Sequence, residues 1–276
     1  MMASAADIDV AAATAHLCRR IRETPVAREP WPHQLVDEFL PPDVFEALLA
    51  SIPEAWLRMR VEEPRSWVLP YGEGKLEHSE GTDLVPWQGR EREASTLWHI
   101  IRALNDERQI FEALKVPFRR EMKAAVERFT ARFVETPRPV QVSRLTRDAR
   151  AYDLLPHTDV PNKLASIVLY VRSDAGTKLG TTLHAPIEPG FACGGFTYHD
   201  PAGFREAGMV PFRPNSAFIF VRDDHTFHGV CFEPGAPDFA RVTIQSNFWI
   251  VDPRKPLHTR PGRGADGTPL RPASQA

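Results

Sequence analysis

The chain has 276 residues, 42% of them hydrophobic, and a formal net charge of −2 at pH 7. This length can bury a sizeable core, either as one large domain or as a catalytic core with a flank. The nearly balanced charge and the lack of a long basic run argue against nucleic acid or a membrane surface as a partner. We therefore expect chemistry on a small molecule or a peptide.

The N-terminus lacks the basic start and continuous apolar stretch of a signal peptide, and no later apolar run approaches the length of a membrane span. The three cysteines, Cys18, Cys193 and Cys231, are odd in number and widely spaced, which disfavours a disulfide framework or a structural zinc site. These features predict a cytoplasmic protein with reduced thiols.

The first half of the chain predicts helices with one short strand. Residues 7–22 are Ala-rich, Leu35–Leu40 indicates a strand, and Pro41-Pro42-Asp43 starts a helix that Pro53 ends. Two more helices are expected near 95–105 and from Pro117 to about Val134. Between Pro53 and these two helices, residues 62–92 are polar and broken by Pro and Gly, which predicts a long loop or irregular hairpin.

After Pro137 the pattern changes to short β-rich runs. They are Val140–Thr146, Leu164–Val171, Thr181–Ala185, Ser216–Val221, His228–Phe232 and Val242–Ile250. Helices followed by short strands indicate an α+β protein whose strands close into a sandwich or barrel. We expect a helical flank over 1–136 with the irregular loop at 62–92, a β-rich core over 137–251, and a coil or tail over 252–276.

Two histidines and one carboxylate form the most informative set of residues. His157 and Asp159 are two residues apart, so they share one face of an extended segment, and His228 follows about seventy residues later. This is the ligand set of a facial-triad iron(II) site. A His-x-Asp tripeptide alone is common by chance, so the interpretation depends on what surrounds His228.

The last strand carries alternating polarity. In the run from Arg241 to Ile250, Arg241, Thr243, Gln245 and Asn247 alternate with mostly apolar residues. Period two predicts a strand with one apolar face and one polar face. Because barrel interiors are usually apolar, a polar inner face indicates a ligand-binding lumen; an exposed sheet face is the alternative.

Together these motifs resemble the iron(II)/2-oxoglutarate-dependent oxygenases, in particular the prolyl-4-hydroxylase-like branch. That superfamily carries His-x-Asp, a distal His often followed by Gly-Val, and Arg-x-Ser/Thr, on a double-stranded β-helix (jelly roll). The stretch Tyr152–Asp159, with Lys163 and Leu169-Tyr170 after it, is similar to the family's first core segments. The resemblance covers about residues 137–251, and Pro32–Leu49 also resembles the N-terminal flank of bacterial members.

The resemblance implies a role for each matching residue. His157, Asp159 and His228 would bind Fe(II), and Arg241 would pair with the distal carboxylate of 2-oxoglutarate through its planar fork, with Thr243 adding a hydrogen bond. His225 competes with His228, but residues three apart face opposite sides of a strand. We choose His228 for its Gly-Val context and its spacing to Arg241.

The family's chemistry implies the cosubstrates and the reaction. Fe(II), 2-oxoglutarate and O2 would be required, ascorbate would support activity, and a C–H bond would be hydroxylated with release of succinate and CO2. Halogenating members typically have Ala or Gly where this chain has Asp159, so hydroxylation is expected. Desaturation, cyclisation and epoxidation use the same ligands, and the motifs do not separate them.

Alternatives remain for substrate and class. The leading substrate is a small metabolite, such as an amino acid or natural-product intermediate; a prolyl or other protein residue is the runner-up. A non-catalytic metal-binding jelly-roll protein would have no need of Arg241 and Thr243, and a zinc hydrolase would need an extra base, for which Asp153 is the nearby acid. We expect residues 185–212 to form a lid or rim loop, with His184 and His199 as solvated loop residues.

Overall fold

The computed structural model describes residues 8–58, 65–70, 76–80, 83–86, 91–132, 138–148, 154–173, 179–230 and 241–251. The helices are α1 Val10–Glu23, α2 Pro42–Ser51, α3 Glu54–Arg58, α4 Glu91–Ala103, α5 Glu107–Leu114 and α6 Arg119–Arg132, with a 3-10 turn at Pro201–Gly203. None of the helices in these ranges is long and apolar enough to cross a bilayer.

Twelve strands are described. They are β1 His33–Val36, β2 Arg65–Pro70, β3 Leu76–Glu80, β4 Asp83–Pro86, β5 Arg138–Asp148, β6 Leu154–His157, β7 Lys163–Ser173, β8 Thr181–Pro186, β9 Phe204–Val210, β10 Ser216–Val221, β11 His228–Val230 and β12 Arg241–Val251.

The strands form two antiparallel sheets. The large sheet has the order β1-β10-β7-β12-β5-β2-β3-β4, and the small sheet has the order β6-β11-β8-β9. From β5 onward the chain passes repeatedly from one sheet to the other, so that, apart from the pair β8 and β9, neighbours in a sheet are not neighbours in sequence. This crossing brings β6 and β11, far apart in the chain, into register, with His157 opposite His228.

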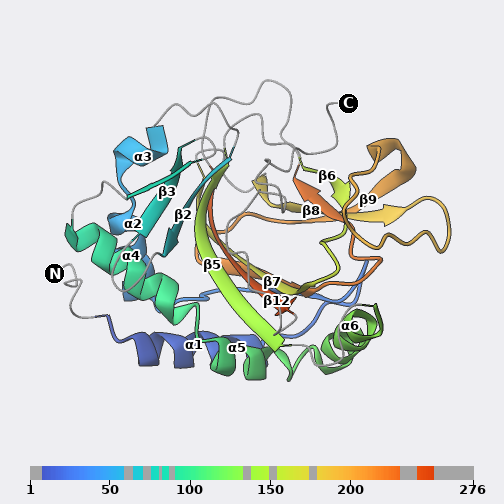
Figure 1. Ribbon diagram of the computed structural model, residues 1–276, viewed down its shortest axis with the longest axis horizontal. Helices are drawn as coiled ribbons and strands as arrows, with labels where there is room; N and C mark the ends of the chain where they lie inside the picture. The colour runs from blue at the N-terminus through green and yellow to red at the C-terminus, as the bar shows by residue number, and fades with distance from the viewer. Residues whose placement is uncertain are drawn as a thin grey trace.

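Helices cover the outer face of the large sheet. Figure 1 shows α1 and α5 running alongside the large sheet, on the side away from β6, β8 and β9. Asp9 caps helix α1, since its carboxylate accepts from the Ala12 N–H at 2.9 Å, and the apolar stripe of the helix, including Leu17 and Ile21, is buried. The Phe111 ring of α5 packs on Phe248 of β12, with centroids 5.8 Å apart.

The alternating pattern of β12 is thereby explained. Val242, Ile244, Phe248 and Ile250 are buried in the core beneath the helices. Ser246 is the polar exception on this face, and its hydroxyl is satisfied by hydrogen bonds with Gln141, Ser143 and the Leu104 carbonyl. The opposite face of β12 is turned toward the small sheet and carries the polar residues, as the sequence predicted.

Most predicted elements are present, and some were missed. The strand expected at Leu35–Leu40 begins earlier, at His33, and ends at Val36, while α3, α5, β6 and β9 were not anticipated. Strand β9 lies within the expected loop 185–212 and pairs with β8. Within 62–92 the structure describes β2, β3 and β4, which extend the large sheet beyond β5. The tail at 252–276 and Cys231 lie outside the described residues.

Candidate metal and cosubstrate site

His157, Asp159 and His228 come together at one point between the sheets. Each offers a ligand atom, and these atoms all lie within 4.8 Å of one another. His157 ends β6, His228 begins β11, and Asp159 lies in the turn before β7. The three side chains could therefore share one cation, with the His/His/carboxylate composition of a facial triad.

Backbone carbonyls orient both imidazoles. The Nδ1 of His157 lies 2.9 Å from the Leu155 carbonyl, and the Nδ1 of His228 lies 2.9 Å from the Thr226 carbonyl. Because a carbonyl oxygen only accepts, Nδ1 must carry the proton in each ring, and Nε2 keeps its lone pair. This second hydrogen bond is the usual way in which a metal-binding histidine is held in its ligating tautomer.

Asp159 is 9% exposed and has a partner for each oxygen. Its Oδ1 accepts from the Lys163 ammonium at 3.0 Å, and its Oδ2 accepts from the Ser166 hydroxyl at 3.0 Å. Lys163 was noted in the sequence only as part of a similar segment, and Ser166 was missed. Both sit in β7, whose first residues follow the His-x-Asp turn, so the backbone itself delivers them to the carboxylate.

The protonation states suit metal binding. Burial and, to a smaller extent, the nearby His228 lower the pKa of His157 to about 3, against the raising effect of Asp159. Burial also lowers the pKa of His228. Burial by itself would raise the pKa of Asp159, but Lys163 and the two histidines outweigh it and hold that pKa far below its usual range. At neutral pH both rings are neutral and the carboxylate is charged, as ligands must be.

Two glycines allow the close packing around the triad. A Cβ at Gly229 would lie 2.5 Å from the Leu154 carbonyl, so the residue after His228 must be small for β11 to approach β6. Gly195 has φ +93°, and its Cβ would lie 2.6 Å from the Asp159 carbonyl. The loop carrying Gly195 therefore packs directly on the metal-site turn.

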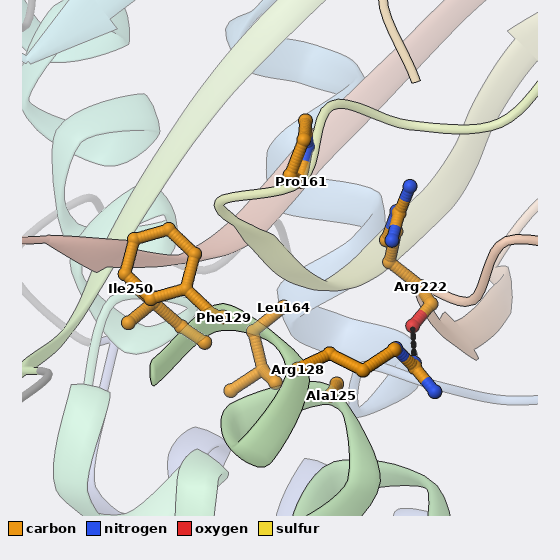
Figure 2. Close-up of a pocket in the computed structure, with 7 residues that line it drawn as sticks. All are labelled: Ala125, Arg128, Phe129, Pro161, Leu164, Arg222 and Ile250. Carbon is orange, nitrogen blue, oxygen red and sulfur yellow. Dashed lines mark hydrogen bonds between the residues drawn. The ribbon is translucent and has the colours of Figure 1, made fainter. Parts of the chain in front are cut away.

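Arg222 also holds the turn that contains Asp159. It is 3% exposed, and its Nε donates to the Asp159 carbonyl at 3.0 Å. Figure 2 shows Arg128 of α6 reaching the Arg222 carbonyl, at 3.1 Å, beside a small cavity under Pro161. That cavity measures about 10 Å³, room for about one water, and is too small for an organic ligand.

A larger cavity of about 190 Å³ contains the triad. The described residues that line it come from both sheets and the loops: Arg144, Leu154, His157, Asp159, Lys163, Ser166, Val168, Thr181, Tyr198, Phe218, Phe220, His228, Val230, Arg241, Gln245 and Asn247. Polar residues of β12 line one wall and apolar residues of β6, β7, β10 and β11 line others. The predicted polar lumen is thus present.

Arg241 forms a buried, charged end of this cavity. It is 2% exposed; its Nη1 donates to the carbonyls of Leu179 and Gly180 at 3.0 and 2.9 Å, and its Nε lies 3.5 Å from the Asp148 carboxylate. The guanidinium also lies 5.8 Å from the Tyr170 ring centroid. Asp148 and Tyr170 were missed as site residues, because their proximity depends on strand register.

Thr243 stands two residues from Arg241 on the same face. It is fully buried, and its hydroxyl has no hydrogen-bond partner among the described residues. Such an orphaned polar atom in a native fold calls for a missing partner.

The other described histidines are not members of the ligand cluster. His225 is exposed and bonds to Asp223 at 2.9 Å, so the structure brings His228 and not His225 to the site. The expectation for His184 was wrong: it lies in β8, is 6% exposed and packs near Phe204, because the loop after β8 folds back over the outer face of the small sheet. His199 is partly buried against Phe191 and Phe227.

Tyr198 is the residue of the 185–212 segment that lines the cavity. Its ring lies 5.1 Å from that of His157, and the residue is 45% exposed. The aromatic residues of 62–92, namely Trp67, Tyr71 and Trp87, have no described side chains. Sequence reasoning had no signal for Tyr198, since an aromatic residue in a Gly/Pro-rich loop is common.

Comparison with known proteins gives likenesses in structure only. No protein-family model matches the sequence. No curated protein matches it either. Among solved structures, the 2-oxoglutarate-dependent epimerase SnoN from nogalamycin biosynthesis is 13% identical over 95% of this chain and 92% of its own, with a TM-score of 0.44.

Two further solved structures are similar at comparable levels. A Pseudomonas putida prolyl-4-hydroxylase is 15% identical over 87% of this chain and 92% of its own, with a TM-score of 0.38. HygX from Streptomyces hygroscopicus, with nickel and 2-oxoglutarate bound, is 10% identical over 79% of this chain and 82% of its own, with a TM-score of 0.44. At these values the likenesses say nothing about residue roles in this chain.

Proposed function

We propose that the protein is an iron(II)/2-oxoglutarate-dependent dioxygenase that hydroxylates a C–H bond of a small metabolite. In this proposal His157, Asp159 and His228 bind the metal, and Arg241 and Thr243 bind the distal carboxylate of 2-oxoglutarate. The observation that supports it best is one cavity lined by both the His/Asp/His cluster and the buried Arg241, with the orphaned Thr243 hydroxyl two residues further along the same strand.

The fold is part of the same proposal. Strands β5, β7, β10 and β12 in the large sheet and β6, β8, β9 and β11 in the small sheet have the alternating connection expected of a double-stranded β-helix, or jelly roll. We take 137–251 as that core, 1–136 as its flank and 252–276 as a tail. The flank also contributes strands, since β1 pairs with β10 and β2 pairs with β5.

The residues present fit the proposed cofactors. Three ligands on one side of a metal leave positions for the 2-oxoglutarate keto acid and for O2. When bound, the metal and cosubstrate supply oxidative decarboxylation to succinate and CO2 coupled to oxidation of the substrate. The protein's own part is to hold neutral Nε2 ligands, to bind the distal carboxylate with a guanidinium fork, and to enclose the target carbon.

Hydroxylation is favoured by Asp159, since its carboxylate occupies a position that halogenating enzymes of this kind leave open. A small metabolite is favoured by the volume of about 190 Å³ between two sheets. Peptidyl hydroxylation is the alternative. The proposal also places the protein in the cytoplasm, with ascorbate as a supporting reductant.

Two experiments test the proposal. Anaerobic addition of Fe(II) and 2-oxoglutarate should produce a weak visible charge-transfer band that is absent in His228→Ala. Succinate formation in the presence of O2 and ascorbate should then be stimulated by one member of a metabolite panel. A protein that binds metal but gives neither the band nor succinate would instead be a metal-binding jelly-roll protein.

A further inference from the structure

We propose that the substrate of this cavity carries a carboxylate, and that Arg144 with Gln245 is the site that binds it. This inference deepens the proposed function and rests on it, since it names the chemical class of the substrate. It begins from a second arginine, on β5, that lines the same cavity as the triad and Arg241.

Strand register places Arg144 on the inner face. Arg144 is the partner of Gln245 across β5 and β12, and the neighbouring inner pairs are Thr146 with Thr243 and Asp148 with Arg241. The Arg144 Nη2 donates to Gln245 Oε1 at 3.3 Å, which holds the guanidinium along the wall. Because Gln245 accepts through its carbonyl oxygen there, its NH2 group is left as a donor.

This site is separate from the end at which Arg241 lies. Gln245 is four residues beyond Arg241 on an extended strand, a separation of about 13 Å between their Cα atoms. The Arg241 guanidinium is fixed by the carbonyls of Leu179 and Gly180 and by Asp148. A single small diacid held by Arg241 and the metal has its two carboxylates already engaged, so a carboxylate at Arg144 belongs to another molecule.

A guanidinium on this wall suits a carboxylate. Of the other cations that line the cavity, Lys163 is paired with Asp159, and Arg241 with Asp148. The planar fork of Arg144 matches a carboxylate with two parallel hydrogen bonds.

The apolar residues of the cavity wall indicate the chemistry of the rest of the ligand. Leu154, Val168 and Val230 line the cavity with Phe218 and Phe220. A molecule with a carboxylate at Arg144 and an apolar body against these side chains would place carbon, not a charged group, near the triad. The inferred substrate class is therefore a carboxylic acid with an apolar body.

The test uses matched acids and amides. The protein is loaded anaerobically with Fe(II) and 2-oxoglutarate, and binding of hexanoate, benzoate and 3-phenylpropionate is compared with that of their amides by ligand-observed NMR and by perturbation of the charge-transfer band. We expect at least one acid to bind about tenfold or more tightly than its amide, the effect of one charge-assisted pair.

Three variants test whether Arg144 and Gln245 cause the preference for acids over amides. In Arg144→Gln the acid-to-amide ratio should fall to about one, and in Arg144→Lys part of it should remain, because charge is kept but the fork is lost. Gln245→Glu puts a carboxylate beside Arg144 and should also abolish the preference. Affinity for 2-oxoglutarate, read from the charge-transfer titration, should change less than about twofold in Arg144→Gln.

The possible results separate the two proposals. Equal binding of all acids and amides by the wild type, or a preference that survives in Arg144→Gln, would overturn the inference while the charge-transfer band still supports the function. A large loss of 2-oxoglutarate affinity in Arg144→Gln would assign Arg144 to the cosubstrate and equally overturn it. Absence of the band in the wild type would refute the proposed function itself.

Discussion

The buried pair Arg241–Asp148 allows a quantitative test of how the proposed cosubstrate-binding end of the cavity is built. The two residues are 2% and 0% exposed, and Nε lies 3.5 Å from Oδ2. Removing one partner of a buried ion pair leaves the other charge uncompensated and costs about 3–5 kcal/mol. Arg241 keeps its two bonds to the Leu179 and Gly180 carbonyls, so we expect Asp148→Asn to cost about 3 kcal/mol, at the lower end.

The assay is urea unfolding of the wild type, Asp148→Asn, Arg241→Met and the double variant. Each single variant already breaks the ion pair, and the double variant leaves no unpaired charge. The loss of unfolding free energy in the double variant should therefore be smaller than the sum of the two single losses, by about 1–3 kcal/mol. Strictly additive effects, or a loss below about 1 kcal/mol in Asp148→Asn, would refute the view that these charges depend on each other.

The same variants separate stability from cosubstrate binding. Arg241→Met removes the guanidinium proposed to bind the distal carboxylate, so 2-oxoglutarate affinity should fall about 10- to 100-fold, the worth of a charged hydrogen-bonded pair. Metal affinity should be nearly unchanged, because Arg241 is not among the clustered ligands. Equal loss of metal and 2-oxoglutarate binding would instead indicate a disrupted fold.

Further expectations concern the metal site and its supports. His228→Ala should lower metal affinity by more than the roughly 10- to 100-fold typical of changes around a metal's ligands, as calorimetry can measure; retained affinity would contradict the ligand assignment. In thermal melts, Gly195→Ala should destabilise the protein by about 1–3 kcal/mol, since the φ of Gly195 is +93° and a Cβ there would lie 2.6 Å from the Asp159 carbonyl. The control Gly203→Ala should cost less than about 1 kcal/mol, because no atom lies within 4 Å of a Cβ at that position. Burial and His228 lower the pKa of His184 to about 4. Below the ordinary pKa of 6.5, His184 therefore takes up a proton in the unfolded chain but not in the folded protein. The contribution of His184 to the free energy of unfolding should be complete above pH 6.5 and fall by up to about 1.4 kcal/mol per pH unit toward pH 4, and this slope should be smaller in His184→Gln.

Local patterns in the sequence predicted the elements that depend on local physics. The Pro41-Pro42-Asp43 start and the Pro53 stop bracket α2, and the period-two run from Arg241 to Ile250 predicted both faces of β12. In each case the signal lies in consecutive residues: proline geometry in one, and side-chain alternation in the other. The strands β6 and β9 were missed because they are short and lack clear alternation, and their pairing comes from neighbours distant in sequence.

In the candidate site, too, some residues could be grouped from local sequence and others only from strand pairing. His157 and Asp159 could be grouped from their spacing, because two residues apart on an extended segment is a local relation. His228 is distant in sequence, so it could be added to them only from its Gly-Val context and its spacing to Arg241. In the structure, the register of β11 against β6 brings His228, and not His225, opposite His157.

The sequence by itself determined the residue types of the proposed metal site, the polar face of β12 and the presence of helices followed by short strands. Only the tertiary structure decided that Asp148 lies beside Arg241, that Ser166 and Lys163 hold the Asp159 carboxylate, that Tyr198 covers His157, and that His184 is buried. The physical reason is that these contacts join residues through strand register and loop packing. Both depend on how the two sheets bury their apolar faces as a whole, which no short stretch of sequence records.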